Sequence, residues 1–257
     1  MARIMSHILA RDNLVRDCLA CAVVVAVTAV STYAVAEPRA VIELFTSQGC
    51  SSCPPADKLL AQFAGDPSLI PISLPIDYWD YLGWKDTLAD PRNSARQRAY
   101  SRVRGDREVY TPQVVVNGSM HALGSDRDAI EAAIALSRKS AMTLSLPVNM
   151  VLSGGALRVS VGSGGDGHSP AEVWIGGLLK AATVAIGRGE NRGKTITYHN
   201  VARQWLKLGT WDGRDETWDL PLRQLGDDGV DEAVVLVQSG TLEKPAAMLG
   251  ATAISLH

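Results

Sequence analysis

The sequence predicts an α/β domain at residues 37–141, followed by an all-β, sandwich-like domain at residues 142–257. Short apolar runs alternate with helix-like stretches from Arg39 onward, which is typical of strands and helices in alternation. After Ala141 the pattern changes, because glycine-rich turns separate short apolar runs and no helical period is present. With 46% hydrophobic residues, the chain has enough apolar side chains for a buried core.

Residues 1–36 have the pattern of a secretory signal peptide. Three arginines precede an uncharged, mostly apolar run from Cys18 to Ala36, which ends in the small-residue pattern Ala-Val-Ala. We therefore expect cleavage after Ala36 and a periplasmic or secreted mature protein. The strongly apolar core, Leu19–Val30, is shorter than the roughly 20 residues of a membrane-spanning helix, so no stable membrane insertion is expected after cleavage. Retention of the segment as an anchor is the alternative.

The first expected strand, Ala40–Thr46, leads into a turn that contains Gly49. A helix is expected from about Ser52 to Ala64. Its two prolines, Pro54 and Pro55, fall where the first helical turn tolerates missing amide hydrogens.

A second strand is expected at Leu69–Ile76 and a second helix from Pro91 to about Val103. Asp90 is suited to cap this helix, because its carboxylate can accept hydrogen bonds from the free amides of the first turn. Pro91 then occupies the first helical position, where its fixed backbone angle is favourable.

The run Gln113–Val116 ends in Asn117-Gly118, and Met120–Leu123 follows, so the sequence predicts a tight β-hairpin. Ser125 is the expected cap of a last helix, which extends through about Lys139. The expected order in this domain is thus strand, helix, strand, helix, hairpin, helix.

The region after residue 141 contains several short runs with the composition of β-strands. They are Leu157–Val161, Ala171–Ile175, Thr183–Ile186 and Ala233–Val237. Because glycine-rich turns separate such runs, we expect them to form separate strands of a sandwich.

The charge of the chain argues against two classes of partner. With 25 basic and 27 acidic residues the net charge is −2, so no broad field attracts nucleic acid or an anionic membrane. No arrangement of serine, histidine and acid is recognisable as a hydrolytic triad, which leaves hydrolysis without support.

The chemistry is expected to depend on Cys50 and Cys53. Cys18 and Cys21 lie in the signal segment and are expected to leave with it, so the mature protein keeps one C-x-x-C pair. The start of a helix lowers the pKa of a thiol through its free amides and partial positive charge. This predicts Cys50 as the exposed, attacking sulfur and Cys53 as the sulfur that resolves a mixed disulfide.

Two other interpretations of the pair stay open. As a stapling disulfide it closes a very short loop, for which the stabilisation is roughly 2 kcal/mol, the least that any spacing gives. As a metal site it supplies half of a tetrahedral shell, although two soft sulfurs also suit Cu(I). No resident metal or other cofactor is expected.

The pair Cys50–Cys53 lies between a strand and a helix, and Thr111-Pro112 precedes a later strand. In these features the chain resembles the thioredoxin superfamily. The resemblance implies that the Thr111–Pro112 bond is cis, that Pro112 packs against the cysteine pair, and that this segment offers a backbone edge to the substrate. A trans proline at the start of a strand is the alternative.

The same resemblance implies a buried acid on the strand before the cysteines. Glu43 lies between Ile42 and Leu44 and has this apolar setting, although it is one residue farther from Cys50 than the corresponding acid of thioredoxins. If buried, Glu43 should have a raised pKa and act as a general base. The alternative is a carboxylate at the edge of the strand in water.

An aromatic segment at residues 77–84 lies between the cysteines and Pro112 and includes Tyr78 and Trp79. Next to Cys50, it would form an apolar and hydrogen-bonding wall for a partner polypeptide. The alternative is that these rings only anchor an inserted loop to the domain.

The whole mature chain also resembles a family of bacterial and plant proteins of unknown function. The motifs that carry this resemblance are residues 43–57, 77–80, 110–113 and 189–193. It implies a thioredoxin-like fold with an accompanying C-terminal region, and no activity. Residues 189–193 are expected to form a turn between strands and to bind no phosphate, since no strand-to-helix context follows.

Taken together, these features predict a periplasmic thiol–disulfide oxidoreductase that acts on protein thiols or disulfides, or on a redox partner protein. One alternative is a non-catalytic binding module with an idle disulfide. Another is a metal-handling protein that uses Cys50 and Cys53 as ligands for Cu(I).

Overall fold

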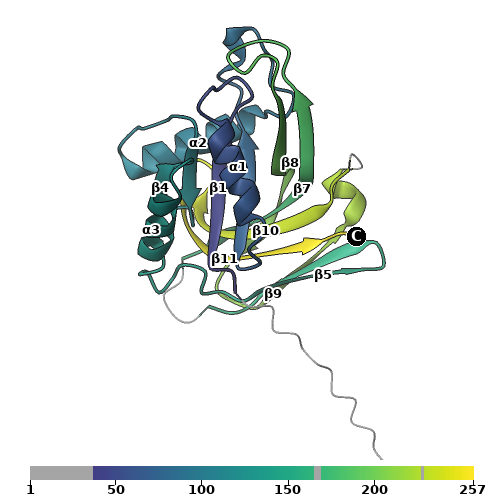
Figure 1. Ribbon diagram of the computed structural model, residues 1–257. Coiled ribbons are helices and arrows are strands. Elements are labelled where there is room, and N and C mark those ends of the chain that lie inside the picture. The colour runs from purple at the N-terminus through teal and green to yellow at the C-terminus, as the bar shows by residue number, and fades with distance from the viewer. Residues whose placement is uncertain (1–36, 165–168, 227–228) are drawn as a thin grey trace, which may run out of the picture. The chain divides into compact units, whose positions relative to one another are not determined.

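The computed structural model describes residues 37–164, 169–226 and 229–257 (Figure 1). The expected signal segment and its cleavage site after Ala36 lie outside these residues. The described residues form a mixed α/β structure in which strands dominate. None of their helices has both the length and the apolar character that a membrane crossing needs.

The first half follows the expected order of elements. Its elements are β1 (Ala40–Thr46), α1 (Pro54–Phe63), β2 (Leu69–Pro75), η1 (Asp80–Leu82, a 3-10 helix), α2 (Pro91–Arg104), β3 (Gln113–Val116), β4 (Met120–Leu123) and α3 (Arg127–Ser137). Strand β1 pairs in parallel with β2 and antiparallel with β3, and β3 forms the expected hairpin with β4.

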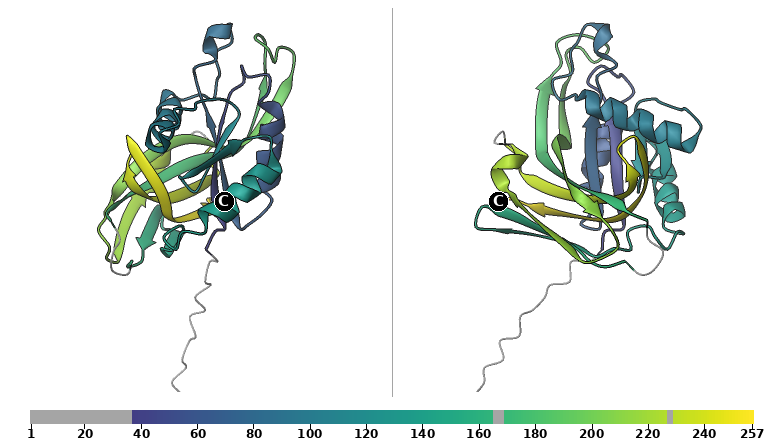
Figure 2. Two further views of the ribbon diagram at one scale, coloured as in Figure 1. Left: turned by 90° about the vertical axis from the view of Figure 1, so that its left-hand side faces the viewer. Right: turned by 180° about the vertical axis from the view of Figure 1, so that it is seen from behind.

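Strand β1 is buried on both faces, because helices cover both sides of the sheet here. Ile42 and Leu44 pack against α1 and α3, whereas Val41 and Phe45 face the opposite side, where Tyr100 of α2 lies. In Figure 1 helix α1 lies in front of β1, and the rear view in Figure 2 has α2 in front of the sheet.

The second half consists of strands and a 3-10 helix. They are β5 (Val148–Ser153), β6 (Ala156–Val161), β7 (Ala171–Ala185), β8 (Thr195–Trp211), β9 (Glu216–Pro221), η2 (Leu222–Leu225), β10 (Glu232–Thr241) and β11 (Lys244–Ser255). The described residues after 141 contain no α-helix, as their lack of a helical period predicts.

The two halves share one sheet of eight strands, in the order β11-β10-β7-β8-β2-β1-β3-β4. Strand β8 joins β2 in parallel where Val201 is opposite Ser73. The described residues belong to one compact unit. The boundary expected at residue 141 therefore marks the change from mixed α/β to all-β elements, while the sheet continues across it.

Strand β7 corrects one expectation from the sequence. The runs Ala171–Ile175 and Thr183–Ile186 were expected as separate strands, but a single strand of 15 residues contains the first and nearly all of the second. The connecting residues include Gly176 and Gly177, which remain extended because β8 and β10 pair with them from both sides. Such pairing overrides the local tendency of glycine to interrupt a strand.

The strands β5, β6 and β9 form a second, three-stranded sheet in the order β5-β6-β9. Its buried residues, including Leu157 and Val159, share a core with Val173, Val235 and Trp211 of the large sheet. The second half thus has two packed β layers, with the small sheet as the outer layer.

The caps of α2 and α3 differ in how well the sequence predicts them. Asp90 caps α2 as expected, and its side chain accepts from the amide of Arg92. The expected cap of α3, Ser125, is wrong by one residue: Asp126 is the cap, and its carboxylate accepts from the amide of Ala129 at 3.0 Å. Either residue type suits this position, so only the backbone geometry distinguishes them.

Replacing Asp126 by alanine should lower the free energy of unfolding by about 1 kcal/mol, because the first turn of α3 loses its cap. The exposed neighbour Ser125 provides the matched control, and Ser125→Ala should change stability by less than about 0.5 kcal/mol. Urea denaturation of both variants measures the difference. A larger loss for Ser125→Ala than for Asp126→Ala would contradict the assignment of the cap.

Candidate functional site

Cys50 and Cys53 form a disulfide in the loop between β1 and α1, with their Cα atoms 5.4 Å apart. Cys53 is the N-cap of α1, and Pro54 occupies the first helical position. The carbonyl of Cys53 accepts from the amide of Asp57, so the cysteine loop continues directly into the first helical turn. The sulfurs therefore lie at the positive end of the helix.

The expectation that the Cys50 sulfur is exposed is wrong in this oxidised form. Cys50 is 1% exposed and Cys53 is fully buried, whereas Ser51 and Ser52 between them are exposed. Cys50 Sγ lies 3.4 Å from the hydroxyl oxygen of Ser52. The surface above the pair is thus formed by the serines and by residues from other parts of the chain.

The turn between β7 and β8 covers the cysteine loop. The side-chain amide of Asn191 donates to the carbonyls of Gln48 and Cys50 at 2.9 and 2.8 Å. The carboxylate of Glu190 accepts from the amide of Ser51 at 3.1 Å. Residues 189–193 are the expected turn between strands, and Figure 1 shows this turn at the same end of the sheet as the loop before α1. Their contact with the cysteines was not foreseen.

The segment containing Pro112 lies against the start of α1, and the Thr111–Pro112 bond is cis. The hydroxyl of Ser52 donates to the carbonyl of Thr111 at 3.4 Å. A Cβ atom added at Gly124 would lie 3.0 Å from the Cβ of Pro112 and 3.2 Å from that of Ala56. Glycine at this position therefore permits close packing between the proline segment and the helix that carries the cysteines.

The aromatic segment contacts both the proline segment and α2. The indole nitrogen of Trp79 donates to Thr111 Oγ1 at 2.7 Å, and the hydroxyl of Tyr78 donates to Gln97 at 3.1 Å. Tyr81 stacks on Trp79 with ring centroids 6.2 Å apart and is 77% exposed. Tyr78 and Trp79 are thus fixed by packing and hydrogen bonds, and Tyr81 presents the exposed ring.

Glu43 is buried, but the structure does not bring it to the cysteine pair. Its two carboxylate oxygens accept from Arg96 and from the hydroxyl of Tyr100, each at 2.6 Å. Glu43 lies two residues from both Val41 and Phe45 along β1, so its side chain points to the same face of the sheet as theirs. This is the α2 face, opposite to α1. The interpretation of Glu43 as a carboxylate in water is wrong, and its partners are those of a buried ion pair.

Asp57 is the buried acid on the cysteine side of the sheet, and the sequence analysis missed it. Thr46 Oγ1 donates to Asp57 Oδ1 at 2.7 Å, while Oδ2 has no hydrogen-bond partner among the described residues. Burial raises the pKa of Asp57 to about 7; the bond from Thr46 opposes this shift and the negative charge of Asp86 adds to it. Its spacing of four residues from Cys53, one helical turn, was the available signal.

Two further ionisable groups lie close to Asp57. Asp86 accepts from the amides of Gln48 and Leu88 at 2.7 and 2.8 Å, and burial raises its pKa. Burial, together with the charges of Asp57 and Asp86, also raises the pKa of Tyr198, whose hydroxyl has no partner among the described residues. A buried cluster of two acids and a phenol thus adjoins the cysteine loop.

A separate group at the end of α2 has the composition of a metal site. Asp106, Glu108 and His121 each bring one ligand atom to within 4.8 Å of the others. Arg104 pairs with Asp106 at 2.7 Å, and His121 Nε2 lies 3.4 Å from the same carboxylate. Asp106 thus already has two partners, and Arg104 supplies a positive charge beside it. The cysteine sulfurs are bonded to each other here, so this form offers no thiolate to Cu(I).

Residues 41–238 match a family described as a protein of unknown function (DUF1223). No curated protein matches the sequence. The X-ray structure of protein AGR_C_4864 from Agrobacterium tumefaciens is 32% identical, with a TM-score of 0.76 over 85% of this chain and 94% of that chain. HBP35 of Porphyromonas gingivalis is 14% identical, with a TM-score of 0.60 over 86% of this chain and 76% of that chain, and this likeness concerns the fold alone.

The raised pKa of Asp57 predicts how stability depends on pH. The folded state holds a proton that the unfolded chain releases at its ordinary pKa of 3.8, so the free energy of unfolding should fall as pH rises from about 4 to about 7. The loss is on the order of 4 kcal/mol. Asp57→Asn cannot release this proton and should remove most of the fall.

Urea denaturation at about pH 5 and about pH 8 covers the upper two of these three pH units, so the expected fall between the two measurements is about 3 kcal/mol. Asp66→Asn is the control, because Asp66 is only partly buried and hydrogen bonds from Ser68 lower its pKa, so it stays charged across the window. Equal pH dependence in the wild type and in Asp57→Asn would show that Asp57 is ionised in the folded protein.

Proposed function

The chain belongs to the DUF1223 family, whose description gives no activity, and we propose that it is an exported thiol–disulfide exchange protein. The observation that carries this proposal is the Cys50–Cys53 disulfide at the start of α1, where Ser52 contacts the carbonyl of Thr111. The order of elements in residues 40–137 also agrees with the resemblance to the thioredoxin superfamily.

The proposed reaction exchanges two electrons between the cysteine pair and a disulfide of a client protein. In the reduced form, the Cys50 thiolate attacks one client sulfur, and the other client sulfur leaves as a thiolate that takes a proton. The Cys53 thiolate then attacks Cys50 in the mixed disulfide and expels the second client thiolate. The pair loses two electrons and the client gains two; the reverse sequence oxidises a client dithiol.

Groups beside the cysteines can stabilise the Cys50 thiolate and take up the proton of Cys53. Helix α1 presents its positive end to the Cys50 thiolate. The hydroxyl of Ser52 lies 3.4 Å from Cys50 Sγ and can turn its one hydrogen from the carbonyl of Thr111 to the thiolate. Asp57 lies one helical turn after Cys53 and has a pKa of about 7, so it suits the uptake of the proton that Cys53 must lose. Asp57 takes over the role that the sequence analysis assigned to Glu43.

The client would bind at the edge formed by Thr111, Pro112 and the aromatic segment. Trp79 holds Thr111 through its indole nitrogen, and Tyr81 adds an exposed ring next to it. Exposed aromatic rings that are fixed by neighbouring contacts are common anchors of protein interfaces. Export to an oxidising compartment, as the sequence of residues 1–36 predicts, would supply protein disulfides as clients.

In this proposal the β7–β8 turn is a removable cover. The contacts of Glu190 and Asn191 with the cysteine loop are hydrogen bonds, which local opening can exchange for water. A client would gain access to Cys50 only after these bonds open. Exchange should therefore be slower than in a protein with an exposed pair.

The burial of Cys50 also favours a second candidate function. If the cover does not open, the disulfide only holds the loop in place, and the protein is a binding module that uses the same edge without redox chemistry. The 1% exposure of Cys50 is the observation that favours this alternative. Thiol exchange distinguishes the two candidates directly.

We expect the Cys50–Cys53 pair to equilibrate with mixtures of reduced and oxidised glutathione, since both sulfurs lie in a loop that local opening exposes. Alkylation of free thiols followed by mass spectrometry gives the reduction potential, and reduction of insulin tests turnover. Cys53→Ser should trap a mixed disulfide at Cys50. A pair that stays oxidised across the whole glutathione range, in the wild type and in variants that open the cover, would support the binding module.

Asn191→Ala should speed reduction of the disulfide by dithiothreitol about tenfold, because two buried hydrogen bonds of the cover are lost. Arg192→Ala is the matched control, since its side chain is exposed in the same turn and contacts neither cysteine among the described residues. The rates are measured by quenched alkylation. Equal rates for Asn191→Ala and Arg192→Ala would show that Asn191 does not limit access.

A further inference from the structure

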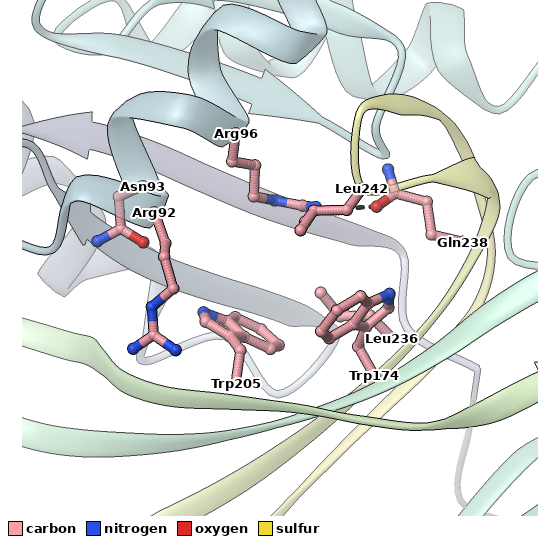
Figure 3. Close-up of a pocket in the computed structure, with 8 residues that line it drawn as sticks. All are labelled: Arg92, Asn93, Arg96, Trp174, Trp205, Leu236, Gln238 and Leu242. Carbon is pink, nitrogen blue, oxygen red and sulfur yellow. Dashed lines mark hydrogen bonds between the residues drawn. The ribbon is translucent and has the colours of Figure 1, made fainter.

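A cavity of about 170 Å³ lies between α2 and the strands β7, β8 and β10 (Figure 3). Arg92 and Arg96 of α2 line one side, and Trp174, Trp205 and Leu236 line the other. This cavity is on the α2 face of the sheet, whereas the cysteine loop leads into α1 on the opposite face. It is therefore separate from the site described above.

The floor of the cavity is built from two indole rings. Trp174 and Trp205 are diagonal neighbours on β7 and β8, because Gly176 pairs with Trp205 two residues after Trp174. Three ring atoms of Trp205 lie within 2.9 Å of where a Cβ atom of Gly176 would be. The ring thus lies flat on the glycine backbone and turns its other face to the cavity. Any side chain at residue 176 would displace it.

Three of the residues that line the cavity, Arg92, Arg96 and Trp205, each have a nitrogen that makes no hydrogen bond within the described residues. Trp205 Nε1 is buried and has no hydrogen-bond partner among the described residues. Arg92 donates to the carboxylate of Asp90 through Nε and Nη2. Arg96 donates to the carboxylate of Glu43 through Nε, and its Nη2 donates to Tyr100 and Gln238. No hydrogen bond within the described residues uses the Nη1 atom of either arginine. Their carboxylate partners, Asp90 and Glu43, do not line the cavity. The cavity therefore faces the positive ends of two ion pairs.

The size of the cavity limits what it can hold. An apolar cavity of about 150 Å³ accommodates one benzene molecule. The flat indole rings of the floor favour an aromatic ligand, whose ring can stack against them. Arg92 and Leu242 line the cavity and are exposed to solvent, so its opening lies beside them.

We propose that this cavity binds a small aromatic carboxylate with a single ring. The ring stacks over Trp174 and Trp205, next to Leu236, and the carboxylate accepts from Trp205 Nε1 and Arg92 Nη1. Figure 3 shows the indole nitrogen of Trp205 on the side of its ring that faces Arg92, so one anionic group can meet both donors. This arrangement satisfies the buried indole nitrogen that the protein leaves without a partner.

Benzoate is the probe for this proposal. We expect saturable, one-to-one binding by calorimetry with a Kd of about 1 mM or tighter, and no saturation with acetate, which has no ring. In ¹H–¹⁵N spectra of the full mature chain, the indole signal of Trp205 should move on titration. Trp205→Phe assigns this signal among the 6 tryptophans of the sequence and keeps an aromatic floor.

Arg92→Ala should weaken benzoate binding about tenfold, because a charge-assisted hydrogen bond at the opening is lost. The binding of toluene, which has no carboxylate, should be unchanged in this variant. Arg102→Ala is the matched control: it removes the same charge from an exposed position of the same helix, outside the cavity. It should bind benzoate like the wild type.

Three results would overturn the proposal. The first is no saturable binding of benzoate to the wild type. The second is equal affinity for benzoate in Arg92→Ala and Arg102→Ala, which would show that no specific cation holds the carboxylate. The third is a shift of other indole signals while the Trp205 signal stays fixed, which would place benzoate elsewhere on the protein.

Discussion

The junction of β8 with β2 is the constraint on which the arrangement of the two halves depends. Val201 lies opposite Ser73, and the side-chain amide of Asn200 donates to the carbonyl of Pro71 at 3.0 Å. Asn200 has a positive φ of 50°, a conformation that asparagine tolerates better than most residues. Through this junction the long hairpin of β7 and β8 is joined to the strands of the first half of the chain, and the β7–β8 turn reaches the cysteine loop.

The position of that turn explains why the cysteine pair is buried. The loop from Gln48 to Ser52 has backbone groups that neither strand nor helix pairs, and buried groups of this kind need partners. Asn191, Glu190 and Asp86 provide them. The second half of the chain thus completes the hydrogen bonding of a loop that belongs to the first half. Any chemistry at the sulfurs is coupled to the opening of these bonds.

The buried acids on the two faces of the sheet differ in their partners. On the α2 face, Glu43 is compensated by the guanidinium group of Arg96 and by Tyr100. On the α1 face, Asp57 has no cation beside it among the described residues; burial, together with the negative charge of Asp86, favours its neutral form against the opposing hydrogen bond from Thr46. A carboxylate paired with a cation is a structural element, whereas an unpaired acid with a pKa of about 7 can exchange a proton near neutral pH.

The sequence by itself determined the local elements of this protein. Pro54, Asp90-Pro91 and Asn117-Gly118 predicted the starts of α1 and α2 and the hairpin, because each restricts the backbone within one turn. The tertiary structure alone decided three features: β8 pairs with β2, the β7–β8 turn covers Cys50, and Asp57 is buried on the α1 face of the sheet. These features depend on packing between residues far apart in the chain, which no local pattern encodes.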